Sequence, residues 1–374
     1  MPSELQVNTI TEATSGSGIT FAKDVIPATP LSHRNMIING GMQMAQRGTS
    51  HTGVSATGYH LDRFETTLQG LGAYTITQST TAPTSEGFAQ SYKIDCTTAD
   101  ASPAASDFFF ISHKMEGQNL QQLCKGTSSA KSVTLSFWCR CTKTGNIQVN
   151  LYDWDNARII GQAVSINSAD TWEYKTLTFA GDTSGVLGND NGASLVLEWW
   201  LDKGSNFSGG SVPTSWEALN NADRAVGCTL ALGDNTANDF YLTGVQLELG
   251  SVATPFESRS YADELARCQR YYWQPDLTTN DFGPISMGSY HSSTLFIGTV
   301  ILPVTPRGVP ELITSGTFQV TSKGSGANAS AITLIDPNIH NCFQIRCTAS
   351  GDNGAGALLR TASFDETFAL NMEL

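Results

Sequence analysis

Six large or polar side chains alternate with apolar residues along the stretches 133–141 and 145–154. Successive side chains of a β-strand point to opposite faces, so the apolar residues predict a buried face and the six predict an outer face. They are Trp138, Arg140, Gln148, Asn150, Tyr152 and Trp154. Flat aromatic rings suit the C–H face of a sugar, and the amide and guanidinium groups supply the directed hydrogen bonds that hydroxyls need. These six residues are the predicted carbohydrate-binding site.

The same outer face has a second interpretation. Trp, Tyr and Arg are also the residues enriched where protein subunits meet, so a partner subunit or a loop of the same chain could cover them. Trp199, Trp200 and Trp216 pose the same question. The sequence leaves both interpretations open.

No catalytic motif accompanies these residues. The chain has no G-x-S-x-G nucleophile elbow, no Walker A phosphate loop and no H-E-x-x-H zinc motif, and its six histidines are scattered. Asp153 with Asp155, and Asp182 with Asp190, lie in stretches where acidic residues usually form turns and less often hold a structural Ca²⁺ ion. The prediction is a protein without enzymatic activity or cofactor, with structural Ca²⁺ as the alternative use of these carboxylates.

Composition excludes two classes of partner. Of the 374 residues, only 15% are charged, below the usual share of about a quarter. The formal net charge of −13 repels phosphate backbones, and no basic run compensates for it. The longest apolar run, 295–304, is too short to span a membrane, and the first residues lack the pattern of a secretory signal. We expect neither nucleic-acid binding nor membrane insertion.

The eight cysteines have no disulfide-framework spacing, which is typical of a protein made in a reducing cytoplasm. Cys139 and Cys141, two apart on a strand, would have Cα atoms about 6.6 Å apart, near the upper limit for a disulfide. No histidine or second cysteine pair lies close in sequence to complete a metal site. Buried free thiols are the prediction.

The elements that must position these side chains are mostly strands. Alternating apolar residues recur at 92–96, 133–141, 147–151 and 195–201. Many turn-bounded strands between residues 35 and 257 favour a β-sandwich of the jelly-roll type. Residues 276–374 return to short strands separated by Gly, Pro, Asn and Ser, which predicts a smaller C-terminal β-sandwich.

The stretch 240–273 changes its structural period. Tyr241, Thr243, Val245, Leu247 and Leu249 alternate with their neighbours, which predicts a strand with one buried face. Beyond Pro255, residues 258–275 are predicted to form a short helix that connects the two β domains.

This helix has both a start signal and an apolar stripe. Ser260 can cap it, with Asp263 three residues on. The stripe follows at helical spacing and is the predicted oligomer interface: Tyr261, Leu265, Cys268 and Tyr272. A helix this short is not stable alone, so three copies packing at a symmetry axis would form a neck.

The N-terminal segment, residues 1–34, has more apolar content than a disordered linker needs, which predicts an arm that orders against a partner. Residues 35–48 carry two short apolar runs around Asn39-Gly40-Gly41, which predicts a hairpin.

Several segments together resemble tail-fibre and related appendage proteins of tailed bacteriophages. They are NMIINGGMQMAQRG (35–48), YHLDRF (59–64), EGQNLQQL (116–123), LSFWCRCTKTG (135–145), LYDWDN (151–156) and TGVQLELGSVATPFESRSYADELARCQRYYW (243–273). The opening SELQVNTITEATSG (3–16) is similar to the virion-anchoring start of such proteins. As an ordered set, these segments cover most of residues 3–273.

The resemblance implies a virion structural protein that is a homotrimer, with a jelly roll similar to carbohydrate-binding modules. It implies that residues 1–34 bind another virion protein and that the chain mediates adsorption to host cell-surface polysaccharide. The protein would be assembled in the cytoplasm of the host bacterium and located in the virion. The alternative is a purely structural or decorating protein of the capsid or tail, without receptor binding. A polysaccharide-degrading tailspike is disfavoured, because such enzymes usually carry a long repetitive β-helix and no repeat is visible.

Overall fold

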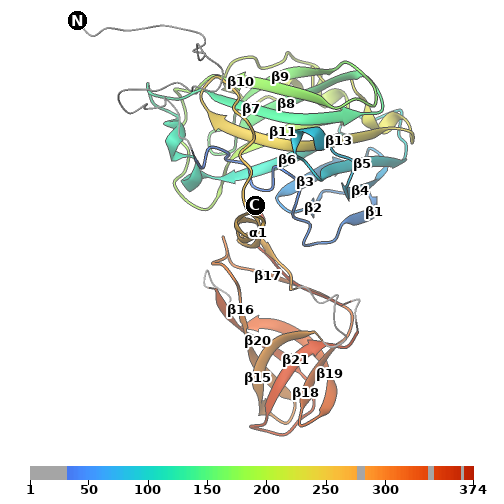
Figure 1. The fold of residues 1–374 in the computed structure, drawn as a ribbon, viewed down its shortest axis with the longest axis vertical. Helices are drawn as coiled ribbons and strands as arrows, with labels where there is room; N and C mark the ends of the chain where they lie inside the picture. The colour runs from blue at the N-terminus through green and yellow to red at the C-terminus, as the bar shows by residue number, and fades with distance from the viewer. Residues whose placement is uncertain (1–31, 276–282, 336–340, 364–365) are drawn as a thin grey trace, which may run out of the picture.

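The computed structural model describes residues 32–275, 283–335, 341–363 and 366–374. A β-sandwich lies at one end, a closed β-barrel lies at the other, and the α-helix α1 (Tyr261–Gln269) lies between them (Figure 1). The predicted attachment arm falls almost entirely outside the described ranges. No helix within those ranges has the length and apolar character needed to span a bilayer.

The sandwich consists of two antiparallel sheets. One has the order β1 (Ser50–Val54), β4 (Ala73–Ser79), β5 (Ser91–Thr98), β13 (Asp239–Leu249), β7 (Val133–Cys141), β10 (Glu173–Phe179). The other has the order β12 (Glu217–Ala218), β9 (Arg158–Ile166), β8 (Gly145–Asp153), β11 (Ala193–Lys203), β6 (Phe108–Glu116), β3 (Phe64–Gln69), β2 (Gly58–Leu61). We call them the six-stranded and the seven-stranded sheet. The predicted mostly β chain with a jelly-roll sandwich is confirmed.

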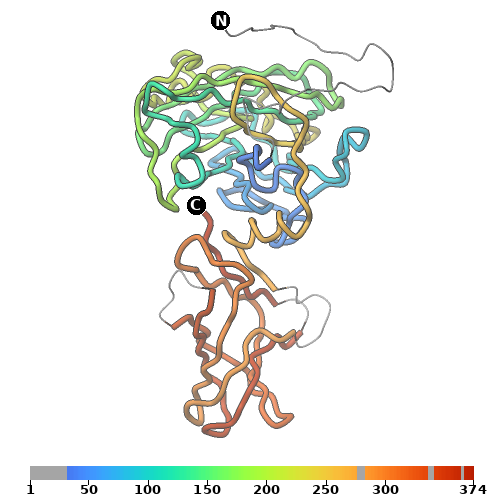
Figure 2. Tube along the Cα trace, turned by 60° about the vertical axis from the view of Figure 1, so that its left-hand side comes forward, coloured from blue at the N-terminus to red at the C-terminus, as the bar shows by residue number. Residues whose placement is uncertain are grey.

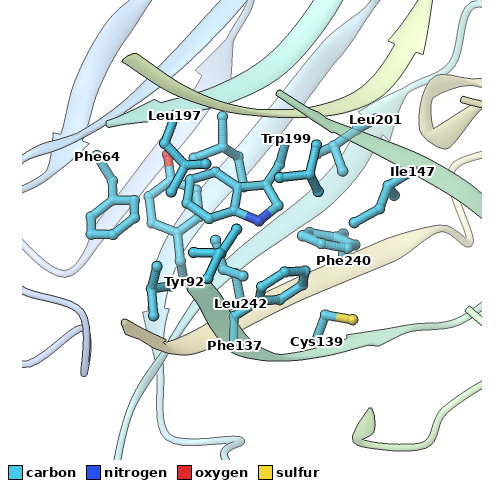
Figure 3. Close-up of a cluster of buried hydrophobic side chains, with 14 of the residues drawn as sticks. Phe64, Tyr92, Phe137, Cys139, Ile147, Leu197, Trp199, Leu201, Phe240 and Leu242 are labelled. Carbon is cyan, nitrogen blue, oxygen red and sulfur yellow. The ribbon is translucent and has the colours of Figure 1, made fainter. Parts of the chain in front are cut away.

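The core lies between the two sheets, where Trp199 of the seven-stranded sheet faces Phe137 of the six-stranded sheet (Figure 3). Their rings meet edge to face, with centroids 6.0 Å apart. Cys139 and Cys141 are buried and unpaired, as predicted, and burial raises the pKa of Cys139 to about 12. Each fully buried large apolar side chain contributes about 1.5–3 kcal/mol, so this layer holds the sheets face to face.

The hairpin predicted for residues 35–48 is wrong. This segment contains no strand and instead lies along β13, where the Met36 amide donates to the Leu247 carbonyl and Gly40 accepts from the Val245 amide, both at 2.9 Å. The glycine at position 40, on which the hairpin prediction rested, is needed because a Cβ atom there would lie 2.1 Å from the Val245 carbonyl oxygen. The predicted turn is present, since the Met42 amide donates to the Asn39 carbonyl at 2.9 Å, but no strands flank it, and Gly40 is needed for the close approach to β13.

The C-terminal unit is a closed barrel rather than the predicted second sandwich. Its strands are β15 (Pro284–Ser292), β16 (Leu295–Ile301), β20 (Cys342–Thr348), β19 (Ser325–Ile335), β18 (Phe318–Ser322) and β21 (Gly356–Thr361). β21 pairs with both β15 and β18, which removes the free edges that a sandwich would leave. Alternation in sequence identifies strands but does not specify which edges pair. Beside the barrel, β14 (Tyr272–Trp273), β22 (Thr367–Asn371) and β17 (Glu311–Ser315) form a small sheet.

Helix α1 begins where its cap predicts. The Ser260 hydroxyl accepts from the Asp263 amide at 3.2 Å and donates to the Asp263 carboxylate at 2.7 Å. The predicted stripe is only partly correct, because Tyr261 is 64% exposed and Tyr272 lies beyond the helix in β14.

The buried side of α1 faces its own chain. Cys268 is fully buried, Leu265 is half-buried, and the Glu264 carboxylate accepts a hydrogen bond from the Asn39 amide. Cys268 and Tyr272 are therefore unavailable to a second copy, which corrects half of the predicted interface. The reason is that segment 35–48 reaches the helix, a contact of long sequence separation that helical periodicity does not contain.

A buried arginine joins the two β units. Arg63 lies in the two-residue turn between β2 and β3 with φ +69°, and its guanidinium lies 3.5 Å from the Tyr271 ring centroid. It pairs with Glu373, at the far end of the sequence. Burial alone would lower the pKa of Arg63, but the Glu373 carboxylate together with Tyr271 and Tyr59 outweighs it, and the pKa lies above its usual value.

Further ion pairs surround this contact. Arg47 lies 3.6 Å from the Tyr272 ring centroid and 3.2 Å from a Glu373 oxygen. Arg270, just after α1, donates two 2.9 Å hydrogen bonds to the Glu116 carboxylate. Figure 2 shows the C-terminus returning to the base of the sandwich, where these groups lie.

Glu373→Gln should lower the free energy of unfolding by roughly 3–5 kcal/mol, because it leaves the Arg63 guanidinium buried without its counter-charge. Urea unfolding of the full chain measures this. Glu311→Gln, an exposed position in β17, is the control and should change the value by less than about 0.5 kcal/mol. Equal effects of the two substitutions would show that Arg63 does not depend on Glu373.

Candidate functional site

The six predicted site residues do not form one surface. Trp138 and Arg140 lie on β7 of the six-stranded sheet, whereas Gln148, Asn150 and Tyr152 lie on β8 of the seven-stranded sheet. Each set points away from the core, and the two outer faces lie on opposite sides of the sandwich. Alternation predicts the outward direction correctly but does not say which sheet a strand joins.

A loop covers Gln148 and Asn150, which are both fully buried. The Gln148 amide donates to the Asp223 carbonyl at 2.8 Å, and the Asn150 amide donates to the Arg224 carbonyl at 2.8 Å. Gln148 also accepts from the Gly227 amide at 2.7 Å. Loop packing is therefore the correct interpretation for these two residues, because their hydrogen-bonding groups hold the segment that precedes β13.

The aromatic residues at the end of β8 remain accessible. Trp154 is 55% exposed and Tyr152 is half-buried, with ring centroids 5.4 Å apart. The Arg224 guanidinium lies 5.7 Å from the Tyr152 ring. The other tryptophans questioned in this sheet are less accessible, since Trp199 lies in the core, Trp200 is buried under the loop and Trp216 is half-buried.

The six-stranded sheet carries a larger aromatic surface. Trp138 faces Tyr174 of β10 directly across the strand pair, with ring centroids 5.2 Å apart. Tyr174 is 45% exposed and Trp138 is half-buried, so one side of the pair faces solvent. Neither ring is needed in the core, which uses Phe137 and Cys139 on the opposite face of β7.

A β-bulge creates a hollow beside this pair. The register of β13 against β7 shifts between Thr243 and Gln246, and Gly244 has φ +62°. The space above Gly244 is taken by the Phe88 ring, since a Cβ atom there would lie 2.7 Å from it. Phe88 packs edge to face on Phe256, with centroids 5.0 Å apart. The hollow measures about 250 Å³ and is lined by Glu86, Phe88, Ser136, Trp138, Tyr174, Gly244, Pro255 and Phe256.

The bulge also changes which β13 residues face outward. Before it, Phe240 and Leu242 face the core, and after it Val245 and Leu247 do, so the predicted single alternation is wrong. Tyr241 is consequently on the outer face, opposite Arg140.

Polar groups extend the aromatic surface. The Arg140 guanidinium lies 5.1 Å from the Tyr241 ring and donates to Asp170 at 2.9 Å, while its buried Nε atom has no hydrogen-bond partner. Burial and the nearby Asp239 carboxylate raise the pKa of Tyr241, so the phenol keeps its proton. Trp172 packs against Tyr241, with centroids 6.0 Å apart. The surface can therefore offer apolar ring faces and directed donors together.

The carboxylates considered for Ca²⁺ have other uses. Asp190 accepts from the Gly192 amide two residues on at 2.8 Å, as a turn former does, whereas Asp155 accepts from the distant Gly188 amide at 2.8 Å and so joins two loops. Asp153 and Asp182 both pair with the Lys125 ammonium group, which supplies the positive charge between them. Among the described residues, no three His, Cys, Asp or Glu side chains are placed to hold a metal ion.

Sequence reasoning missed Tyr174, Tyr241, Phe88 and Phe256. Tyr174 had a usable signal, because the buried Leu177 and Phe179 alternate with it along β10. Tyr241 was assigned to the wrong face because a bulge has no period. Phe88 and Phe256 lie in loops, where alternation carries no information.

A scan against protein-family models finds no match, and a search of the curated proteins finds none either. Solved structures give weak likenesses. A putative sugar binding protein from Bacteroides thetaiotaomicron is 11% identical, with a TM-score of 0.33 over 58% of this chain and 100% of that chain. The CBM22-1 xylan-binding domain of Paenibacillus barcinonensis Xyn10C is 14% identical, with a TM-score of 0.24 over 55% of this chain and 94% of that chain.

The enzymatically active domain of tailspike protein 4 from bacteriophage CBA120 is 11% identical, with a TM-score of 0.28 over 58% of this chain. The match spans only 21% of that tailspike chain. At these TM-scores the likenesses carry no argument about function, and the fold assignment rests on the strand order itself.

Gly244→Ala should destabilise the sandwich by about 1–3 kcal/mol, because Ala is strained at positive φ and its Cβ would displace Phe88. Thermal unfolding measures the loss. Gly209→Ala is the matched control, since its Cβ would meet nothing within 4 Å. A Gly244→Ala protein as stable as the control would mean that the bulge does not fix the hollow.

Proposed function

We propose that this chain is a structural subunit of a fibre or appendage of a tailed bacteriophage and that it binds polysaccharide on the host surface. The virion assignment is supported by the ordered set of segments between residues 3 and 273 that resemble such proteins. The binding site that we assign is the outer face of the six-stranded sheet. The proposal includes no catalytic step.

The observation that carries the binding proposal is the exposed Trp138–Tyr174 pair beside the hollow at Gly244. Aromatic rings that face solvent gain favourable contacts when a ligand covers them. Flat rings match the C–H face of a pyranose. The Arg140 guanidinium, which is partly exposed and bonded to Asp170, can donate further hydrogen bonds at the same surface.

A second function uses the same surface. Trp, Tyr and Arg are enriched at subunit contacts, so these residues would equally suit a decorating protein that packs against another virion subunit. The hollow supports the saccharide, because a concavity of about 250 Å³ suits a small ligand, whereas a subunit contact needs a surface of about 800 Å² on each partner.

Binding to a panel of bacterial surface polysaccharides tests the proposal. The parent should bind at least one of them saturably, and Trp138→Ala/Tyr174→Ala should weaken binding at least tenfold. Each lost aromatic contact costs about 0.5–1.5 kcal/mol, and 1.4 kcal/mol corresponds to about tenfold in affinity.

Tyr152→Ala/Trp154→Ala is the matched control, because it removes two accessible rings from the opposite face. Loss of binding in this control alone would move the site to the seven-stranded sheet. A parent that binds no polysaccharide would favour the decorating protein.

The proposal also includes a homotrimer and attachment through residues 1–34. Of the predicted interface, Tyr261 and Leu265 remain available on α1. Tyr261→Asp/Leu265→Asp should reduce the mass measured by light scattering if α1 forms the neck, because it places charges at the contact. Ala262→Asp, at an exposed neighbouring position, is the control. An unchanged trimer mass would place the contact elsewhere, and a monomeric parent would contradict the trimer.

A further inference from the structure

The barrel carries a polar cup beside the turn between β15 and β16. The cup measures about 220 Å³ and lies between the β18–β19 hairpin and the loop 349–355. It is lined by Tyr290, Ser322, Lys323, Ser325, Ala327, Ser350, Gly351 and Asp352. None of these positions belongs to the aromatic surface described above.

An unusual turn builds one wall. Ser322 pairs with Ser325, so Lys323 and Gly324 form a two-residue turn, with φ +52° and +80°. Glycine, asparagine and aspartate are the residues that normally tolerate these angles, whereas lysine is rare there. The turn places the Lys323 ammonium group 2.8 Å from the Asp352 carboxylate across the cup. Strained positions of this kind cluster at functional sites.

Backbone hydrogen bonds fix the opposite wall. Within loop 349–355, Ala349 and Gly351 donate to the β15–β16 turn at 3.1 and 3.0 Å, and Gly354 donates to the Tyr290 carbonyl at 2.8 Å. Only glycine fits at position 351, because a Cβ atom there would lie 2.2 Å from the Tyr290 ring. The cup is therefore formed before any ligand arrives, which reduces the ordering cost of binding.

The floor of the cup is aromatic and its rim is hydroxylated. Tyr290 is 1% exposed, and its hydroxyl donates to the Ser350 carbonyl at 2.8 Å, so the ring is held in one position. Ser325 and Ser350 add hydroxyl groups that can donate and accept. The rim therefore presents short polar side chains above a closed floor, and the Tyr290 ring is too buried to stack on a ligand.

The charges of the cup cancel. Lys323 and Asp352 are the two charged residues of its lining, and they form a pair with each other. Both are more than 70% exposed, so the pair adds little to stability, and water or a ligand can reach it. An anion or a cation would gain no net attraction, whereas vicinal hydroxyls could accept from the ammonium group and donate to the carboxylate.

We propose that this cup binds one neutral sugar unit, as a second glycan site separate from the sheet surface. Its volume is below the roughly 300 Å³ at which pockets for drug-sized ligands begin, so a single ring fits and an oligosaccharide does not. The choice of a sugar, rather than another small polyol, rests on the proposed function.

Saturation-transfer NMR of the full chain with glucose, galactose, mannose, rhamnose and N-acetylglucosamine tests this inference. At least one sugar should receive saturation from the parent. Asp352→Asn and Lys323→Ala should each weaken its binding about tenfold or more, because hydrogen bonds to charged groups are lost. Lys143→Ala/Asp234→Ala, which removes a partly exposed ion pair of the sandwich, is the control and should bind as the parent does.

The outcomes separate the two sites. Trp138→Ala/Tyr174→Ala should lose polysaccharide binding while its monosaccharide signal and the response of that signal to Asp352→Asn persist. Monosaccharide binding that survives both cup substitutions, or no transfer to any sugar, would overturn the cup proposal and leave the sheet proposal standing. If glycerol received as much saturation from the protein as the sugars do, the assignment of a sugar as the ligand would be overturned.

Discussion

The Arg63–Glu373 ion pair over Tyr271 is the contact on which the arrangement of the molecule depends. A guanidinium cannot be removed from water without a counter-charge, and here the counter-charge comes from a residue about 300 positions later in the chain. The chain must therefore return to the sandwich after β22 for Arg63 to have its counter-charge. Met372 extends this contact by donating its amide to the Tyr271 carbonyl at 2.7 Å. The positive φ at Arg63 is consistent with this account, because a strained turn persists only where its surroundings hold it.

The same contact explains why α1 faces its own chain. Residues just after the helix supply Tyr271 and Arg270, and both are held by the base of the sandwich. Once these are fixed, the face of α1 that carries Cys268 points inward. An apolar stripe in the sequence shows that a helix face is covered, but it does not show by what. The cover became visible only when segment 35–48 was placed in space, because Asn39 and Glu264 are 225 residues apart.

Features that depend on residues close in sequence could be predicted, and features that depend on distant residues could not. Local signals were sufficient for the strands β7, β8 and β11, for the Ser260 cap and for the buried thiols, since each depends on residues within a few positions. Three features could not be obtained this way: the bulge at Gly244, which reverses the facing of β13; the sheet that each strand joins, which separates Trp138 from Tyr152; and the loop over Asn150. The bulge and the loop depend on partners more than 70 residues away, and the sheet that a strand joins depends on which edges pair. Of the four aromatic residues that line the hollow, Trp138 was predicted, whereas Phe88, Tyr174 and Phe256 were missed; Phe88 and Phe256 lie in loops, where alternation carries no information.

The two proposed sites differ in a way that follows from their walls. The sheet surface presents the Trp138–Tyr174 pair on adjacent strands, and loop residues around Phe88 and Phe256 wall one side of it. The cup on the barrel is closed by a hairpin and a clamped loop, so it accepts an end or a branch rather than a chain passing through. Neither uses net charge, which suits a chain whose formal charge of −13 would repel an acidic ligand at long range. Recognition without net charge leaves specificity to the stereochemistry of the hydroxyl groups, because only a correctly placed pair of hydroxyls could bond both Lys323 and Asp352.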